Sequence, residues 1–210
     1  MQSNSKYIKR NLLGEALIVY KKNLRFNKLQ KQVLIGTLLG DASIPKQYKK
    51  SSYNIKFEQK VDNKAYIDHL YFIFIDWVGT PPSIRIIEND NRRSIWFRTY
   101  RHKSFLYYYN MFYNGNKKSV PKLISKFLTP VSIAYWYMDD GSKEKIGYKF
   151  STHAFIFSDQ RKLVEALNKY KLDALIYKDR KYYYIYIKNV KKFNELVSPY
   201  ILDIFRYKLH

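Results

Sequence analysis

The sequence predicts an α+β fold built from two similar halves, and three observations support this prediction. Two short apolar segments, residues 34–42 and 133–141, each end on acidic residues, and they lie about half a chain apart. Each is followed by stretches of strand-like alternation that flank an amphipathic helix. No linker rich in Pro, Gly or Ser interrupts the 210 residues, so we expect two subdomains that share one core.

The first half is expected to begin with a helix over residues 27–41. Asn27, followed three residues later by Gln30, gives a capping-box pattern. Gly36 and Gly40 are four residues apart and share one face of this helix. Because a glycine lowers helix stability by about 1 kcal/mol relative to alanine, we expect another backbone to approach this face closely.

Strands follow this helix. Residues 54–58 and 92–99 place polar side chains on one face and apolar side chains on the other. An amphipathic helix over 63–78 lies between them. The first half is therefore expected to be a sheet with a helix on its apolar face and an open, cationic face.

The second half repeats this order. Thr129 and Pro130 are a favourable N-cap and first residue for a helix over 129–140. The other predicted elements are strands over 149–154 and 182–188, a helix over 159–171 capped by Ser158 or Asp159, and a connection over 113–128 with a helix at 121–127. The expected divisions are an N-terminal extension over 1–26, a first subdomain over 27–118 and a second over 119–210.

The charge of the chain indicates an acidic partner. Lys and Arg number 39 against 17 Asp and Glu, a net charge of +22. Such a surplus opposes folding by self-repulsion, and nucleic acid is the leading candidate to neutralise it. A membrane surface would require a concentrated basic helix, whereas these cations are spread over the whole chain. No apolar run approaches the length of a membrane span, and the N-terminus lacks a secretory signal, so we expect neither membrane insertion nor secretion.

The chain has no cysteine and four scattered histidines. This excludes disulfides, thiolate catalysis and cysteine-ligated zinc, and no histidine pair has the spacing of a zinc motif. Any bound metal must have oxygen ligands, which favours Mg²⁺ or a similar hard cation such as Mn²⁺. The abundance of Lys, Ile, Asn, Tyr and Phe fits an AT-rich genome, so we expect an organelle (mitochondrion or chloroplast) or a prokaryotic cytoplasm as the source.

Asp41 and Asp140 occupy matching positions at the C-terminal ends of the two predicted apolar helices. The helix dipole disfavours an anion there by about 0.3–1 kcal/mol, so a matched pair of such acids indicates function. If the helices pack together, the carboxylates converge, and a divalent cation would relieve their repulsion. The carbonyls of Gly40 and Asp139 are further oxygen ligands. In so basic a chain, this arrangement predicts hydrolysis of a phosphodiester.

The two segments resemble the two LAGLIDADG motifs of single-chain, intron-encoded homing endonucleases. The resemblance extends from about Asn27 to the C-terminus and includes the stretch TPVSIAYWYMDDG. It implies a pseudo-twofold αββαββα fold with the two motif helices packed at its centre. It also implies that the eighth residue of each motif, Asp41 or Asp140, is catalytic, and that Gly36 and Tyr135 stand at the third position, where the helices touch most closely.

The motifs also depart from the family pattern. Leu39-Gly40 and Met138-Asp139 replace the Asp-Ala pair that precedes the catalytic acid, and Tyr135 replaces a small residue at the contact. Asp139 therefore competes with Asp140 as a metal ligand, although the register favours Asp140.

The resemblance further implies roles for basic residues around the metal. Lys118 and Lys208 would orient water and balance the charge that develops on the phosphate. Lys56 and His153, in comparable first strands, would lie just outside them. The family also implies cleavage of both DNA strands across the minor groove, with staggered ends, by a monomer.

Two antiparallel sheets with open polar faces are expected to form a saddle along the major groove of double-stranded DNA. Because the two halves differ in sequence, the target is expected to be asymmetric. The candidate DNA-binding residues are Lys46, Lys49, Lys50, Asn54, Lys56, Arg92, Arg98, Lys143, Lys149, Ser151, His153, Tyr182, Tyr184 and Lys188.

Three other functions remain open. An RNA-splicing maturase of the same fold would bind intron RNA, although retention of both acids favours cleavage. A non-catalytic DNA-binding protein would need neither acid. A basic ribosome-associated protein would explain the charge but not the paired, acid-ended helices.

Overall fold

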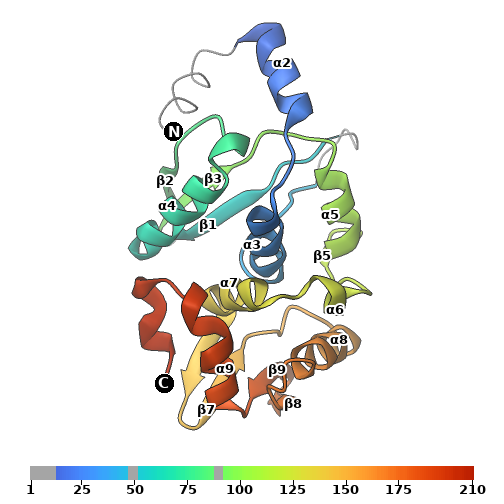
Figure 1. The fold of residues 1–210 in the computed structure, drawn as a ribbon, viewed down its shortest axis with the longest axis vertical. Coiled ribbons are helices and arrows are strands. Elements are labelled where there is room, and N and C mark those ends of the chain that lie inside the picture. The colour runs from blue at the N-terminus through green and yellow to red at the C-terminus, as the bar shows by residue number, and fades with distance from the viewer. Residues whose placement is uncertain (1–12, 47–51, 88–91) are drawn as a thin grey trace. The chain divides into compact units, whose positions relative to one another are not determined.

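The structure is a computed structural model that describes residues 13–46, 52–87 and 92–210 (Figure 1). It consists of helices and antiparallel sheets, which confirms the predicted α+β class. Among these described residues, no helix has both the length and the apolar character needed to cross a bilayer.

The chain divides into two compact units. The first unit consists of Met1–Asn27 and Ser43–Leu106, and the second of Lys28–Ala42 and Tyr107–His210. The helix that carries the first acidic segment therefore packs with the second half of the chain. As a result, both acid-ended helices belong to one unit.

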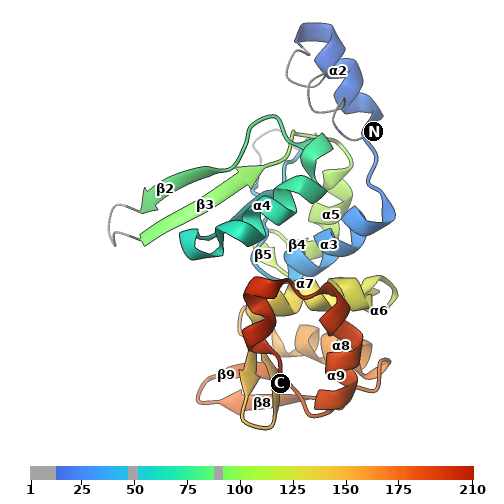
Figure 2. The same ribbon diagram turned by 60° about the vertical axis from the view of Figure 1, so that its left-hand side comes forward.

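The first unit is a small sheet with helices. Its elements are α2 (Gly14–Asn23), β1 (Lys56–Lys60), the 3₁₀ turn η1 (Val61–Asn63), α4 (Lys64–Ile73), the 3₁₀ turn η2 (Ile75–Trp77), β2 (Ser83–Ile87) and β3 (Arg92–Arg98). The strands are antiparallel in the order β1-β3-β2. Figure 2 shows β2 and β3 as a hairpin, with α4 alongside the sheet.

Aromatic side chains fill the space between α4 and this sheet. Phe57 stacks on Phe97 at 4.8 Å and on Phe74 at 5.0 Å between ring centroids, and all three are buried. The helix predicted over 63–78 is interrupted at Phe74, whose φ of −100° and ψ of 18° end α4 before η2 begins. This break lets both Phe74 and Trp77 reach the core.

The second unit contains the larger sheet. Its elements are α3 (Lys28–Leu39), most of α5 (Phe105–Phe112), β4 (Tyr113–Asn114), β5 (Lys117–Lys118), α6 (Ile124–Phe127), α7 (Pro130–Asp140), β6 (Gly141–Glu144), β7 (Gly147–Phe150), α8 (Phe157–Asn168), β8 (Ala174–Asp179), β9 (Tyr182–Ile187), α9 (Val190–Val197), and the 3₁₀ turns η3 (Ser198–Tyr200) and η4 (Asp203–Lys208). Four of its strands pair in the order β6-β7-β9-β8, all antiparallel.

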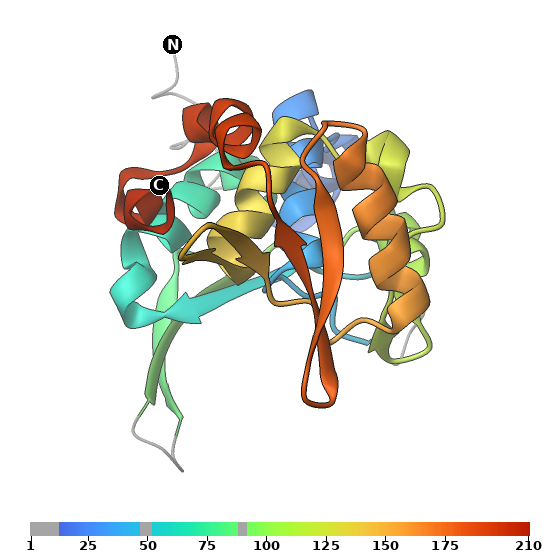
Figure 3. The ribbon, with the colours of Figure 1, turned by 90° about the horizontal axis from the view of Figure 1, so that it is seen from below.

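Strand alternation separates the two faces of this four-stranded sheet. Tyr148, Phe150, Ile185 and Ile187 are buried against helices, and Phe193 of α9 packs on Tyr148 at 4.5 Å. Figure 3 shows α8 lying along the β8–β9 hairpin on this covered face. The opposite face remains open, as the alternation predicts.

Helices α3 and α7 pack side by side (Figure 1). A Cβ added to Gly36 would lie 2.3 Å from the backbone oxygen of Ser132 and 3.0 Å from the Cβ of Tyr135. The close backbone approach predicted from the glycines is therefore confirmed. Thr129 caps α7 as predicted, because its Oγ1 accepts a hydrogen bond of 3.2 Å from the Ser132 amide.

Two other predicted helices also differ in their bounds. The helix expected over 121–127 is reduced to the single turn α6. Helix α8 begins two residues early, so neither Ser158 nor Asp159 is its N-cap. Instead, the buried Asp159 carboxylate accepts hydrogen bonds of 2.9 Å from the Val120 amide and 2.7 Å from Lys162.

Candidate active site

The two predicted acids lie at the ends of the packed helices. Helix α7 ends at Asp140, which is half-buried, and α3 ends just before Asp41, which is exposed. The helix ends touch, since a Cβ added to Gly40 would lie 2.5 Å from both the Cβ and the Oδ2 of Asp139. Both helices and both acids belong to the second unit.

Asp139 ties these helix ends together. Its Oδ2 accepts a hydrogen bond of 3.1 Å from the backbone amide of Asp41. The carboxylate thus serves as an acceptor for the end of α3. This bond gives Asp139 a structural role, and the assignment of Asp140 as the acid in the second motif stays a prediction.

Two lysines bind the same helix ends. The ammonium of Lys118, on β5, donates to the carbonyl of Gly40, and that of Lys208, at the end of η4, donates to the carbonyl of Met138 at 2.8 Å. A cation is favourable at a helix C-terminus, where the last carbonyls lack intrahelical donors. The structure thus brings both predicted lysines to the predicted acids.

The charges in this cluster influence one another. Burial and then the charge of Asp41 raise the pKa of Asp140 from 3.8 to about 7. Lys118, Lys208 and the nearby indole N–H of Trp136, which lies outside hydrogen-bond geometry, act in the opposite direction. Two carboxylates that repel each other in a partly buried place are a natural setting for a cation.

Burial shifts the pKa values of the two lysines in the opposite direction to that of Asp140. It lowers the pKa of Lys118 and of Lys208, against the attraction of Asp41, Asp139 and Asp140. Desolvation disfavours the charged ammonium, whereas the neighbouring carboxylates favour it. The cluster therefore mixes acids and bases whose charges depend on one another.

The donor set fits a hard divalent cation. Asp41 and Asp140 supply carboxylate oxygens, and the Gly40 carbonyl retains a lone pair beside the one that Lys118 occupies. In the described part of the chain, no cluster of three or more His, Cys, Asp or Glu side chains is arranged for metal binding. A cation held by two carboxylates must complete its shell with water and substrate oxygens, as Mg²⁺ commonly does.

The candidate DNA-binding residues of the first unit fall into three groups. Lys56 and Arg98 are paired across β1 and β3 on the open face, and Lys46 is exposed. Asn54 was expected beside Lys56, but it lies before β1, between Tyr53, which forms a bridge to His102, and Ile55, whose amide binds Thr99, and it is only 7% exposed. Lys49 and Lys50 lie outside the described residues, and for Arg92 only the backbone, in β3, is described.

Five candidates of the second unit converge on one hollow. A cavity of about 330 Å³ on the open face is lined by Lys149, Ser151, His153, Asp179 and Tyr182–Tyr184. The Lys149 ammonium lies 4.4 Å from the centre of the Tyr184 ring.

Lys188 is exposed, as expected of a DNA-binding residue, whereas Lys143 does not lie on the open face. Lys143 pairs with the buried Tyr148 on the covered face, and its ammonium binds the Leu209 carbonyl at 3.1 Å. Lys143 is therefore directed away from the open face on which a DNA contact was expected.

Several residues of the open faces were not among the candidate DNA-binding residues. Arg85 and Ser94 lie on the open face of the first sheet with Glu58, and Tyr177 and Tyr186 on that of the second. Strand β2 was not recognised, although the polar Ser83 and Arg85 alternate with the apolar Ile84 and Ile86. That alternation is the signal that identifies Arg85.

The fold and the acid-ended helix pair define a DNA endonuclease family. Residues 31–193 match the model of the LAGLIDADG DNA endonuclease family, and the chain belongs to this family. A protein of Wickerhamomyces canadensis named "Probable intron-encoded endonuclease 1" is 34% identical over 96% of this chain and 95% of its own length.

Other relatives and solved structures agree with this assignment. The structure of the homing endonuclease I-WcaI bound to its DNA recognition sequence matches with a TM-score of 0.87 and 32% identity, over 96% of this chain and 97% of that one. The cytochrome b mRNA maturase bI2 of Saccharomyces cerevisiae is 29% identical over 84% of this chain and 46% of its own length. The structure of I-DmoI in complex with DNA and Mn has a TM-score of 0.52 at 16% identity, over 86% of this chain and 96% of that one, a likeness of fold alone.

Proposed function

We propose that this chain is a site-specific endonuclease that hydrolyses both strands of double-stranded DNA at a long, asymmetric target, with a divalent metal ion and staggered products. One observation carries the proposal. The carboxylates of Asp41 and Asp140 come from the ends of two packed helices and lie close enough for the charge of one to raise the pKa of the other. Both acids come from one chain, so a monomer suffices for the site.

Asp41 and Asp140 would hold the cation, Mg²⁺ or Mn²⁺. When bound, such a cation polarises the phosphate and lowers the pKa of a water molecule. An ammonium has three N–H donors, and Lys118 and Lys208 each donate one to a helix carbonyl. Their remaining donors would orient the attacking water and stabilise the negative charge that develops on the phosphate.

The open faces of both sheets would bind DNA. Their cations would contact phosphates, and their hydrogen-bonding side chains would contact base edges in the major groove. A chain of net charge +22 releases counterions when it binds DNA. Affinity should therefore fall steeply with salt, and a salt-independent affinity would contradict this mode of binding.

Selection of cleavable sequences from a randomised DNA library with Mg²⁺ present tests the proposal. The wild type should enrich one asymmetric sequence, and cleavage should stop when the metal is chelated. Asp41→Asn and Asp140→Asn should abolish cleavage while retaining binding. Asp173→Asn, at an exposed carboxylate outside the cluster, is the matched control and should cleave normally. Normal cleavage by both active-site variants would refute the assignment.

Assistance of RNA splicing is a second candidate function. It is favoured by the similarity to two cytochrome b mRNA maturases, from Saccharomyces cerevisiae and Debaryomyces hansenii, each 29% identical to this chain. In a splicing assay with the host intron, a maturase should accelerate splicing even as Asp140→Asn, because binding RNA requires neither acid. Relatives named for introns and for cytochrome b mRNA also favour an organellar genome as the source.

A further inference from the structure

The open face of the first sheet holds an acid among its cations. Glu58 lies on β1, two residues from Lys56 and from Lys60, and its side chain is 23% exposed. An uncompensated carboxylate on a surface that binds DNA would repel phosphates. The side chains around Glu58 show which charges compensate its carboxylate.

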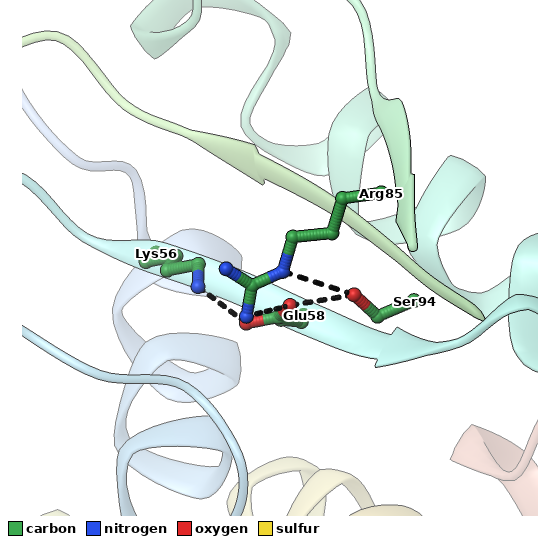
Figure 4. A network of polar contacts seen from close by, with 4 residues as sticks. All are labelled: Lys56, Glu58, Arg85 and Ser94. Carbon is green, nitrogen blue, oxygen red and sulfur yellow. Dashed lines mark hydrogen bonds and ion pairs between the residues drawn. The ribbon is translucent and has the colours of Figure 1, made fainter. Parts of the chain in front are cut away.

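Glu58 holds a neighbouring arginine in place (Figure 4). Its Oε1 lies 2.6 Å from Nη2 of Arg85 and accepts a hydrogen bond of 2.7 Å from the hydroxyl of Ser94. Nε of Arg85 donates to the same hydroxyl at 3.2 Å, and Lys56 binds Oε2 of Glu58. Burial alone would raise the pKa of Glu58, but the hydrogen bonds and charges of these partners hold it below its usual value.

These contacts occupy one edge of the arginine fork. Nε and Nη2 of Arg85 face Ser94 and Glu58, whereas Nη1 makes no hydrogen bond within the described residues. The side chain is 50% exposed. Because the guanidinium is planar, its Nη1–Nη2 edge points away from the held edge and presents two parallel N–H groups to solvent.

The exposed edge matches guanine. Guanine presents O6 and N7 as adjacent acceptors in the major groove, and a bidentate arginine is its commonest specific partner. A phosphate oxygen has the same acceptor chemistry but carries a charge, and the carboxylate of Glu58 beside Arg85 would repel it. The acceptors of a neutral base edge carry only partial charges and are repelled much less, so the position of Glu58 favours a base contact over a phosphate contact.

We propose that Arg85 reads one guanine in the half of the DNA target that the first sheet contacts. Glu58 and Ser94 are positioning residues that fix the guanidinium before DNA arrives. This inference rests on the proposed function and adds a specificity determinant to it. Prior fixation reduces the side-chain entropy lost on binding, which sharpens discrimination between bases.

The second sheet provides the internal comparison. Its open face carries Tyr177, Tyr184 and Tyr186 around Lys149, and no arginine is held by a glutamate among the described residues of that unit. The base preference due to Arg85 should therefore be confined to a single base pair.

The experiment selects DNA from a randomised library, once for binding and once for cleavage, with the wild type and three variants. The wild type should require a G·C pair at one position. Arg85→Ala should lose this preference, about 5- to 150-fold, at that position alone. Arg85→Gln should shift it towards A·T, because glutamine pairs with adenine. Glu58→Gln should weaken the preference at the same pair without moving it.

A base analogue tests the contact atom. Replacing the selected guanine with 7-deazaguanine removes N7 and should weaken binding by the wild type several-fold, but not binding by Arg85→Ala. Arg98→Ala provides the contrast, since loss of a phosphate contact weakens all sequences alike and lowers the salt dependence.

Two results would overturn the inference: equal weakening of every sequence by Arg85→Ala, or selected sequences that are unchanged in all three variants. Absence of cleavage with retained base preference would instead count against the proposed function. A melting curve of each variant tests whether it is folded. The Arg85 side chain is 50% exposed, so its replacement should leave the sheet intact.

Discussion

Gly36→Ala should destabilise the protein, although alanine is the better helix former. The added Cβ would lie 2.3 Å from the backbone oxygen of Ser132, roughly 1 Å closer than ordinary contact. A backbone carbonyl cannot rotate aside, so α3 and α7 must separate along their shared face. Overpacking of this kind costs up to about 3 kcal/mol, against a propensity gain of about 1 kcal/mol. The net loss should be about 2 kcal/mol, or about 4–8 °C in melting temperature.

Urea denaturation followed by circular dichroism measures this effect, with Lys31→Ala as the control. Lys31 lies on the exposed side of α3, so its replacement changes helix propensity without touching α7, and stability should stay within about 0.5 kcal/mol. DNA cleavage by Gly36→Ala should also fall, because separation of the helices moves Asp41 away from Asp140. A Gly36→Ala protein as stable as the wild type would refute the argument for close packing.

Three further changes follow from contacts already described. In the metal-free protein, the folded state holds the Asp140 proton more tightly than the unfolded state, so the free energy of unfolding should fall as pH rises from about 4 to about 7. A plot of melting temperature against pH should therefore be flatter for Asp140→Asn than for the wild type. An unchanged slope would contradict the raised pKa of Asp140. Thr129→Ala removes the N-cap bond of α7 and should cost about 1 kcal/mol in urea denaturation, whereas Thr129→Ser should cost much less. Trp77→Ala empties a buried site in the first unit and should cost about 3–5 kcal/mol; a loss below 1 kcal/mol would show that the site collapses.

The elements that depend on local pattern could be predicted from the sequence. Matching acid-ended helices placed Asp41 and Asp140 together, because both the spacing and the glycine face are properties of single helices. Strand alternation assigned Lys56, Arg98 and Lys149 to open faces, since side chains of one strand alternate strictly. The helix faces and strand faces depend on residues that are close together in the sequence.

Features that depend on residues distant in the sequence could not be predicted from it. Asp159 is attractive as a helix cap, but its acceptor role is set by the amide of Val120, 39 residues away. Alternation extends the first strand to Asn54, whereas β1 begins at Lys56, Tyr53 forms a bridge to His102, and Asn54 is buried. Such contacts leave no periodic signature, so only the folded chain reveals them.

The contact between Gly36 and Tyr135 makes the two helices non-interchangeable. The glycine on α3 faces the tyrosine on α7 at equivalent motif positions, so each half is shaped as the complement of the other. A chimera with two copies of the first helix would leave a hole at this crossing, and one with two copies of the second would set two rings against each other. When halves of related enzymes are recombined to create new cleavage specificities, the residues at the positions of Gly36 and Tyr135 must therefore be transferred as a pair.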